Sequence, residues 1–249
     1  MSRGSSSAVL LGLAGLVLSS LALGLALGSA HDPSVEIILS IRLPRVVLGL
    51  LVGAALGTAG AMLQALLQNP LADPFVLGIS GGAALGGVTA LGLGGAVGLA
   101  TLSIPIAAFA GALLATALLY WVAGRTHNTT THALLLTGVI FNAFASSLIV
   151  LITSLLDASR ITGVFLWLIG SIRHVDPWMI AAVSGLLALG MLGGLRDAYA
   201  LNLISQGEDT ALHLGVDVAR VRRRVLLATA GMIGAAVAVS GLVGFVGLI

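Results

Sequence analysis

The sequence predicts an all-α membrane protein, a polytopic bundle of about seven apolar helices. Of its 249 residues, 58% are hydrophobic and 8% are charged, whereas soluble domains carry about 25% charged residues. The apolar residues fall into runs long enough to cross a bilayer, separated by shorter polar stretches. Glycine is abundant, with 34 residues, which is typical of helices that pack closely in lipid.

The first apolar run, 8–30, is long enough to cross a bilayer at about 1.5 Å per residue. A cleaved signal peptide is the alternative, but its apolar core would be unusually long, so we expect a retained helix. Six further spans are expected at 46–67, 75–93, 99–123, 134–156, 178–195 and 225–249. Residues 162–172 are too few to span, so we expect a re-entrant or interfacial helix there.

A polar stretch, "QNPLADP" at 68–74, separates the second span from the third. The position of Asn69 before a proline disfavours continuation of the helix. Asp73 and Pro74 are suited to the N-cap and first position of the next helix. We therefore expect a turn at the membrane interface, where water reaches its polar groups.

A long polar loop is expected at 196–224. Ser205 or Gly207 can start a short helix within it, because the helix dipole favours Glu208 and Asp209 in the first turn. Gly215 suits the position after its end, which often needs a positive φ. Asp217 can cap the next span.

The arginines suggest an orientation. With the N-terminus inside, seven lie inside, at positions 3, 125, 196, 220 and 222–224, and four lie outside, at positions 42, 45, 160 and 173. Arg42 and Arg45 oppose the positive-inside rule, and a functional role would explain their position.

An internal repeat is also expected, because 52–63 resembles 233–244. The two copies would cross the membrane in opposite directions, as in inverted-repeat transporters. Chance likeness between helices rich in glycine and alanine is the alternative. We expect one permease domain over 1–249, with a first repeat at about 42–173 and an incomplete second from about 222. The break in the second copy predicts a truncated chain.

The composition argues against several functions. The chain has no lysine for a P-loop and no cysteine, and its net charge of +2 does not favour nucleic acid. All acidic residues and histidines lie in loops or at helix ends, where they suit neither an ion relay nor a base for Ser80 in "GISGG". We expect no catalytic residue, metal site or cofactor. Two classes of membrane protein remain, a passive channel and a permease driven by another chain.

Four segments carry a family resemblance. "RLPRVVLGLLVGAALGTAGAMLQALLQNPLADPFVLGISGGAALG", at 42–86, resembles permease subunits of ABC importers for iron-siderophores, haem and vitamin B12. "FLWLIGSI" at 165–172 is similar to the family's W-x-x-G-S segment, and "LNLISQGEDTALHLGVDV" at 201–218 to its cytoplasmic coupling loop. "SGLVGFVGLI" resembles the lead-in to a Pro-His segment that this sequence lacks. The resemblance covers 41–249 and implies about ten spans, of which the last three would be missing.

The resemblance implies roles for particular residues. Arg42 and Arg45 would face carboxylates of a substrate-binding protein, with headgroup contact as the alternative. ATPase coupling would use a knob that includes Gly207, Glu208, Asp209, Ala211, Leu214 and Gly215, whereas the alternative is a solvated loop. Gln64, Trp167, Gly170 and Ser171 would border the pathway. Alternatively, Gln64 bonds a neighbouring helix, and Trp167 is an anchor at the membrane interface.

The implied function is that of a transport subunit and not an enzyme, with ATP hydrolysed on a separate chain. It would carry an iron-siderophore, haem or cobalamin-type metal chelate across the bacterial inner membrane, with its N-terminus cytoplasmic. The Gly-Ser after Trp167 favours a siderophore or haem over cobalamin. The expected partners are a second permease, two ATP-binding subunits and an extracytoplasmic binding protein. An ion-coupled carrier or channel, an intramembrane protease using Ser80 and an inactive fragment are the alternatives.

Overall fold

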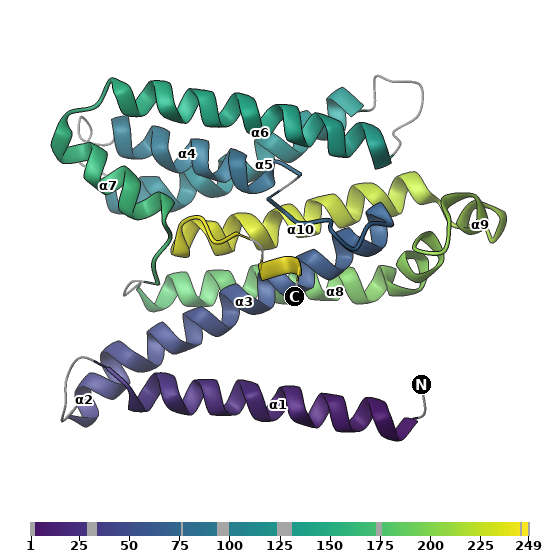
Figure 1. The fold of residues 1–249 in the computed structure, drawn as a ribbon, viewed down its shortest axis with the longest axis horizontal. Helices are drawn as coiled ribbons and strands as arrows, with labels where there is room; N and C mark the ends of the chain where they lie inside the picture. The colour runs from purple at the N-terminus through teal and green to yellow at the C-terminus, as the bar shows by residue number, and fades with distance from the viewer. Residues whose placement is uncertain are drawn as a thin grey trace.

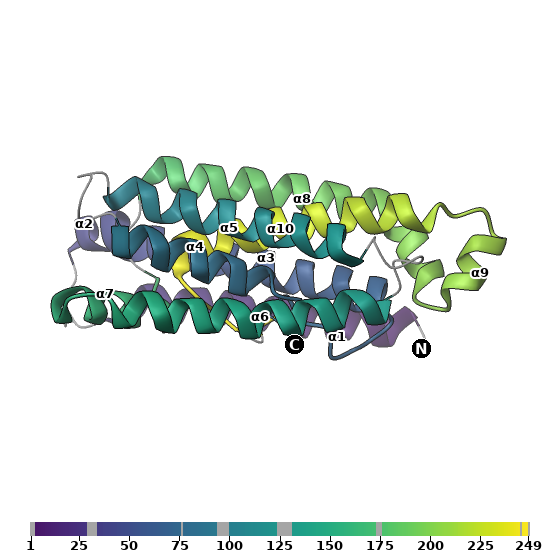
Figure 2. The same cartoon turned by 90° about the horizontal axis from the view of Figure 1, so that it is seen from above.

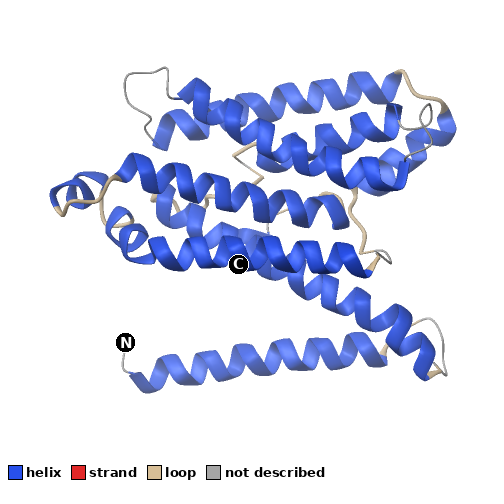
Figure 3. Cartoon of the chain, turned by 180° about the vertical axis from the view of Figure 1, so that it is seen from behind, coloured by secondary structure: helices blue, strands red, loops and turns tan. Residues whose placement is uncertain are grey.

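A computed structural model describes residues 3–28, 34–75, 77–93, 100–123, 131–172, 176–244 and 246–248. Across these ranges every regular element is helical (Figure 3), which confirms the predicted fold class. The α-helices are α1 (Arg3–Ala26), α2 (Val35–Ile37), α3 (Leu43–Leu67), α4 (Ile79–Leu93), α5 (Ala100–Ala123), α6 (Thr131–Ser154), α7 (Ala158–Leu168), α8 (Pro177–Ile204), α9 (Glu208–His213) and α10 (Val218–Ser240). A π-helical turn, η1 (Ile38–Arg42), leads into α3, and a 3-10 turn, η3 (Val246–Leu248), follows α10.

Six helical segments in the described ranges are long and apolar enough to cross a membrane, so the chain is a multi-pass membrane protein. The third expected span differs, because α4 has 15 residues and begins at Ile79 rather than at 75. The residues before it form a loop that starts at Gln68, in the left-handed conformation with φ 51°. The expected run at 162–172 is the short helix α7.

The long helices lie side by side in a flat bundle (Figures 1 and 2). α9 and the N-terminus lie at one end, here the α9 end, while α7 lies at the other, the α7 end (Figure 1). α10 lies at the centre and contacts α3, α4, α5 and α8. In its most apolar stretch 67% of the residues are buried, compared with 0% in α1. α10 is therefore the core helix of the described bundle.

Close packing around α4 and α5 depends on glycine. A Cβ added to Gly82 would meet the backbone of Gly111, and one added to Gly86 would meet the carbonyl of Ala107. Such contact between helix backbones is how small residues favour association in lipid.

The predicted loop at 196–224 is wrong in its extent. α8 continues to Ile204, α10 begins at Val218, and the loop proper is 205–217 with α9 inside it. The expected last span is also displaced, because α10 ends at Ser240, before Gly241 with φ 72°. Some polar residues of the expected loop lie on helices and join them. Asp197 of α8, for example, pairs with Arg224 of α10.

The two copies of the predicted repeat differ in shape. α3 continues through Gly60 to Leu67, whereas α10 ends one residue before Gly241, the counterpart of Gly60. The inverted repeat stays a prediction.

Candidate functional site

The short helix α9 has the ends that the sequence predicts. Gly207, one of the two candidates for its start, is the N-cap with φ 138°, and Glu208 and Asp209 occupy the first turn. At its other end the Gly215 N–H donates to Leu212 O at 3.0 Å and the Val216 N–H to Ala211 O at 3.0 Å. This pair of bonds is a Schellman motif, with Gly215 at φ 82°. Asp217 accepts a hydrogen bond from the Arg220 N–H at 3.0 Å and caps α10.

The loop 205–217, which we call the α9 knob, projects beyond the ends of the long helices (Figure 1). Ala211 is fully buried at its base. Leu212 and Leu214, in contrast, are 53% and 60% exposed. The knob therefore presents apolar side chains from a short helix that begins after Gly207 and ends in a Schellman motif.

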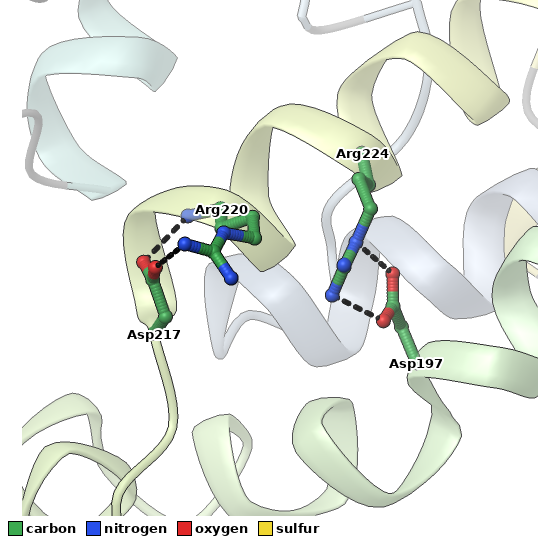
Figure 4. Close-up of polar contacts among 4 residues, drawn as sticks. All are labelled: Asp197, Asp217, Arg220 and Arg224. Carbon is green, nitrogen blue, oxygen red and sulfur yellow. Dashed lines mark hydrogen bonds and ion pairs between the residues drawn. The ribbon is translucent and has the colours of Figure 1, made fainter.

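Among the described residues, three ion pairs lie at the α9 end, and two of them join different helices. The Arg222 Nη2 group donates to both carboxylate oxygens of Glu208 at 2.9 Å, and its side chain is only 4% exposed. Arg224 donates to the two carboxylate oxygens of Asp197 at 2.9 and 2.6 Å (Figure 4). A third pair joins the exposed side chains of Asp217 and Arg220 at 3.2 Å (Figure 4).

Arg224 uses two nitrogens for the two oxygens of Asp197, and this forked geometry is the strong form of a charge-assisted hydrogen bond. Arg222 uses its Nη2 group alone for both oxygens of Glu208. Glu208 therefore fixes α9 to α10, and Asp197 fixes α8 to α10. Sequence reasoning missed Asp197, Arg222 and Arg224 as site residues. The signal was present as two acids and an arginine cluster within one polar stretch, but their pairing depends on how the helices pack.

The "QNPLADP" stretch forms the expected turn only in its first part, where the Ala72 N–H donates to Asn69 O at 3.0 Å and residues 68, 70 and 71 are exposed. Asp73 is 2% exposed, and its Oδ1 accepts a hydrogen bond from the Phe75 N–H at 2.7 Å, so it caps a turn and not the start of α4. Asp73 lies against Gly247, which also contacts the carbonyl of Leu56. Leu56 is about three turns before the end of α3. The loop therefore runs back along α3, and the expectation that water reaches Asp73 is wrong.

Two polar side chains secure this returning loop and its neighbours. Asn142 of α6 donates its amide N–H to the Phe75 carbonyl. Gln64 of α3 donates to Gly247 O at 3.0 Å. Gln64 thus bonds a neighbouring segment, which is one of the two alternatives that the sequence left open.

Trp167, Gly170 and Ser171 come together with the end of α10 at the α7 end. The Trp167 ring lies against Gly87 of α4, where any added Cβ would collide with it. The Ser171 N–H donates to Ser240 O at 2.7 Å. Gly170, with φ 78°, lies against Leu242 O, so two backbone segments approach closely there. Gln64 takes no part in this contact.

Arg42 and Arg45 have different environments. Arg42 is 8% exposed, and its guanidinium donates to Leu25 O at 2.8 Å and Ala26 O at 3.0 Å. Those carbonyls end α1, so Arg42 is placed where a helix dipole favours a cation. Arg160 likewise donates to Gly92 O at 2.9 Å, near the end of α4. Arg45 is exposed, so of the two arginines expected to meet a binding protein it is the more accessible.

These features define a multi-pass membrane protein with a core helix, α10, and a rigid knob beyond one end of the bundle. Residues 5–249 match the FecCD transport family, and the chain belongs to that family.

Its relatives are permease proteins. The chain is 36% identical over 223 residues to the hemin transport system permease protein HmuU of Yersinia pestis, covering 89% of this chain and 66% of the relative. It is 39% identical over 214 residues to the cobalamin import system permease protein BtuC of Halobacterium salinarum, covering 84% and 56%. The chain therefore spans less than two thirds of the length of these relatives.

A solved structure has the same fold. It is described as an inward-facing conformation of a metal-chelate type ABC transporter and superimposes with a TM-score of 0.86 at 27% sequence identity. The match covers 98% of this chain and 79% of that structure.

Proposed function

We propose that this chain acts as the transmembrane permease subunit of a binding-protein-dependent ABC importer for a metal chelate. The family, and relatives named for hemin and cobalamin transport, support this cargo class. ATP hydrolysis belongs to two separate ATP-binding subunits, and a second permease subunit completes the membrane part.

The observation that carries the proposal is the α9 knob. A Schellman motif closes the end of α9 and Ala211 is buried beneath it, so its surface is held in one shape. Leu212 and Leu214 are exposed beyond the bundle, where no membrane core would cover them. A rigid helix with exposed leucines suits insertion into a cleft of a partner protein, and the bond from Glu208 to Arg222 ties that helix to α10.

Charge supports placing the α9 end in the cytoplasm. Six arginines lie on this end within the described ranges, at 3, 196, 220, 222, 223 and 224, and cytoplasmic ends carry an excess of basic residues. The N-terminus lies at the same end (Figure 1). The ATP-binding subunits then meet α9, and the extracytoplasmic binding protein meets the α7 end.

At the α7 end, Arg45 is the residue suited to dock the binding protein. Its side chain is exposed and makes no hydrogen bond or ion pair within the described ranges. Arg42 supports α1 and contributes to docking through the position of that helix. Trp167, Gly170 and Ser171 border the outer pathway, and Gln64 contributes by holding Gly247.

The experiment is co-purification of the transporter with its ATP-binding subunit after Leu212→Asp and Leu214→Asp are introduced together. We expect loss of the ATPase from the complex, because two charges replace the apolar surface of the knob. Val35→Asp, at an exposed residue of α2, is the control and should leave association unchanged. Full retention of the ATPase by the double variant contradicts the proposal.

A further inference from the structure

We propose that α10 transmits movement of α9 to α7, with Arg222 and Gly241 as the positioning residues at its two ends. We call α10 the strut in this role. This inference rests on the proposed function, because the force on α9 comes from an ATP-binding partner. It assigns a route through this chain from the α9 end to the α7 end.

The first end of the strut is fixed by charge. Arg222 is 4% exposed and holds both oxygens of Glu208 at 2.9 Å. Only Val216 and Asp217 separate Gly215, after α9, from the start of α10. A displacement of α9 therefore moves α10, because separating the two would break an ion pair and leave a buried arginine without that partner.

The body of the strut is continuous. α10 has 23 residues and so extends about 34 Å. Proline is absent from it, and contacts with α3, α5 and α8 surround it. A helix packed in this way moves as a unit, since interiors are dense and transmit strain.

The far end meets α7 through backbone atoms. The Ser171 N–H donates to Ser240 O at 2.7 Å. Gly241, at φ 72°, lies so close to the Trp167 carbonyl that no Cβ would fit between them. Gly170 makes the reciprocal approach to Leu242 O. Since no flexible side chain separates these segments, a shift of α10 reaches the end of α7 directly.

The helix to which the movement would pass, α7, has side chains that no neighbouring helix in the described ranges covers. Phe165 and Leu166 of α7 are 56% and 49% exposed, whereas Val164 is fully buried. Trp167 lies on Gly87 of α4. A shift at Gly170 and Ser171 therefore tilts α7 against α4, and the segment that borders the outer pathway responds to events at α9.

A label on α7 tests the strut in the assembled transporter. The chain has no cysteine, so Phe165→Cys gives a single site for a nitroxide spin label. We expect ATP with vanadate to change the mobility of this label, and Arg222→Gln to abolish that change. The exchanged pair Glu208→Arg with Arg222→Glu should restore it, and Arg220→Gln, in the exposed pair, should not affect it. An unaltered response in Arg222→Gln overturns the inference.

Hydrogen exchange on the purified chain gives a readout that needs no partner. The Ser171 amide, bonded to Ser240 O, should exchange faster in Arg222→Gln and in Gly241→Ala, and at the wild-type rate in Arg220→Gln. If the Ser171 amide exchanges at the same rate in the wild type and the three variants, the inference that α10 acts as a strut is overturned, whether or not an ATPase binds. Failure of the wild-type chain to bind an ATPase, with the exchange pattern as expected, contradicts the proposed function alone.

Discussion

Arg224 of α10 holds both carboxylate oxygens of Asp197 of α8, at 2.9 and 2.6 Å. The two partners differ in burial, because the Asp197 side chain is 6% exposed and that of Arg224 is 37% exposed. This asymmetry determines which of the two can be removed at less cost. An unpaired buried charge destabilises strongly, whereas a partly exposed one can turn toward water.

We therefore expect Arg224→Leu to lower the free energy of unfolding by about 3 kcal/mol, since it leaves the Asp197 carboxylate buried without its partner. Asp197→Leu should have a smaller effect, because Arg224 can reach solvent. Denaturant unfolding in detergent measures both. A larger loss for Asp197→Leu than for Arg224→Leu contradicts the assignment.

Substitution of Arg42 should affect the stability of the protein, whereas substitution of Arg45 should affect docking of the binding protein. Arg42→Gln removes charged hydrogen bonds to the end of α1, so we expect a loss of about 1.5–3 kcal/mol in stability and faster hydrogen exchange near Ala26. Arg45→Gln should leave stability unchanged and weaken binding-protein docking, measured by titration of the binding protein onto the reconstituted transporter. Equal stability losses in the two variants would rule out the capping role.

A glycine should be required for stability at position 241 but not at position 231. Gly241 has φ 72° and lies against the Trp167 carbonyl, so Gly241→Ala should destabilise by at least about 1–3 kcal/mol. Gly231 lies within α10 with no atom within 4 Å of an added Cβ, so Gly231→Ala should be neutral or stabilise by up to about 1 kcal/mol. Thermal unfolding compares them, and equal melting temperatures would contradict the contact.

Asn142 should control the returning loop. Its amide donates to the Phe75 carbonyl, so Asn142→Ala should free that segment and increase hydrogen exchange at 72–78. Ser147 lies on the same helix, is exposed, and donates only within α6, to Ala143 O. Ser147→Ala is therefore the matched control. Protection of 72–78 that survives Asn142→Ala would show that other contacts hold the loop.

Features set by neighbouring residues were predictable from the sequence. The apolar runs predicted the helices, and the glycines and acids around α9 predicted its caps, because capping depends on the few residues at a helix end. The start of α8 at Asp176 and Pro177 is a local feature of the same kind, because proline suits the first helical position.

Features set by distant contacts were not predictable. Asp73 lies against Gly247, so the loop that holds it is placed by a segment far along the chain. Asp197 and Arg224 were expected in a loop because the sequence around each of them is polar. In the structure they pair across α8 and α10, and each lies within its helix. Arg42 looked available to a partner because its bond to the end of α1 depends on how α1 returns alongside α3.

Uptake into proteoliposomes tests the central claim most directly. A ferric hydroxamate, haemin and cobalamin are each offered with the binding protein outside, to transporter reconstituted with or without its ATP-binding subunits. The account predicts that at least one chelate accumulates against its gradient only with ATP and those subunits present, and that Leu212→Asp with Leu214→Asp abolishes this accumulation. Uphill accumulation without any ATP-binding subunit would contradict it.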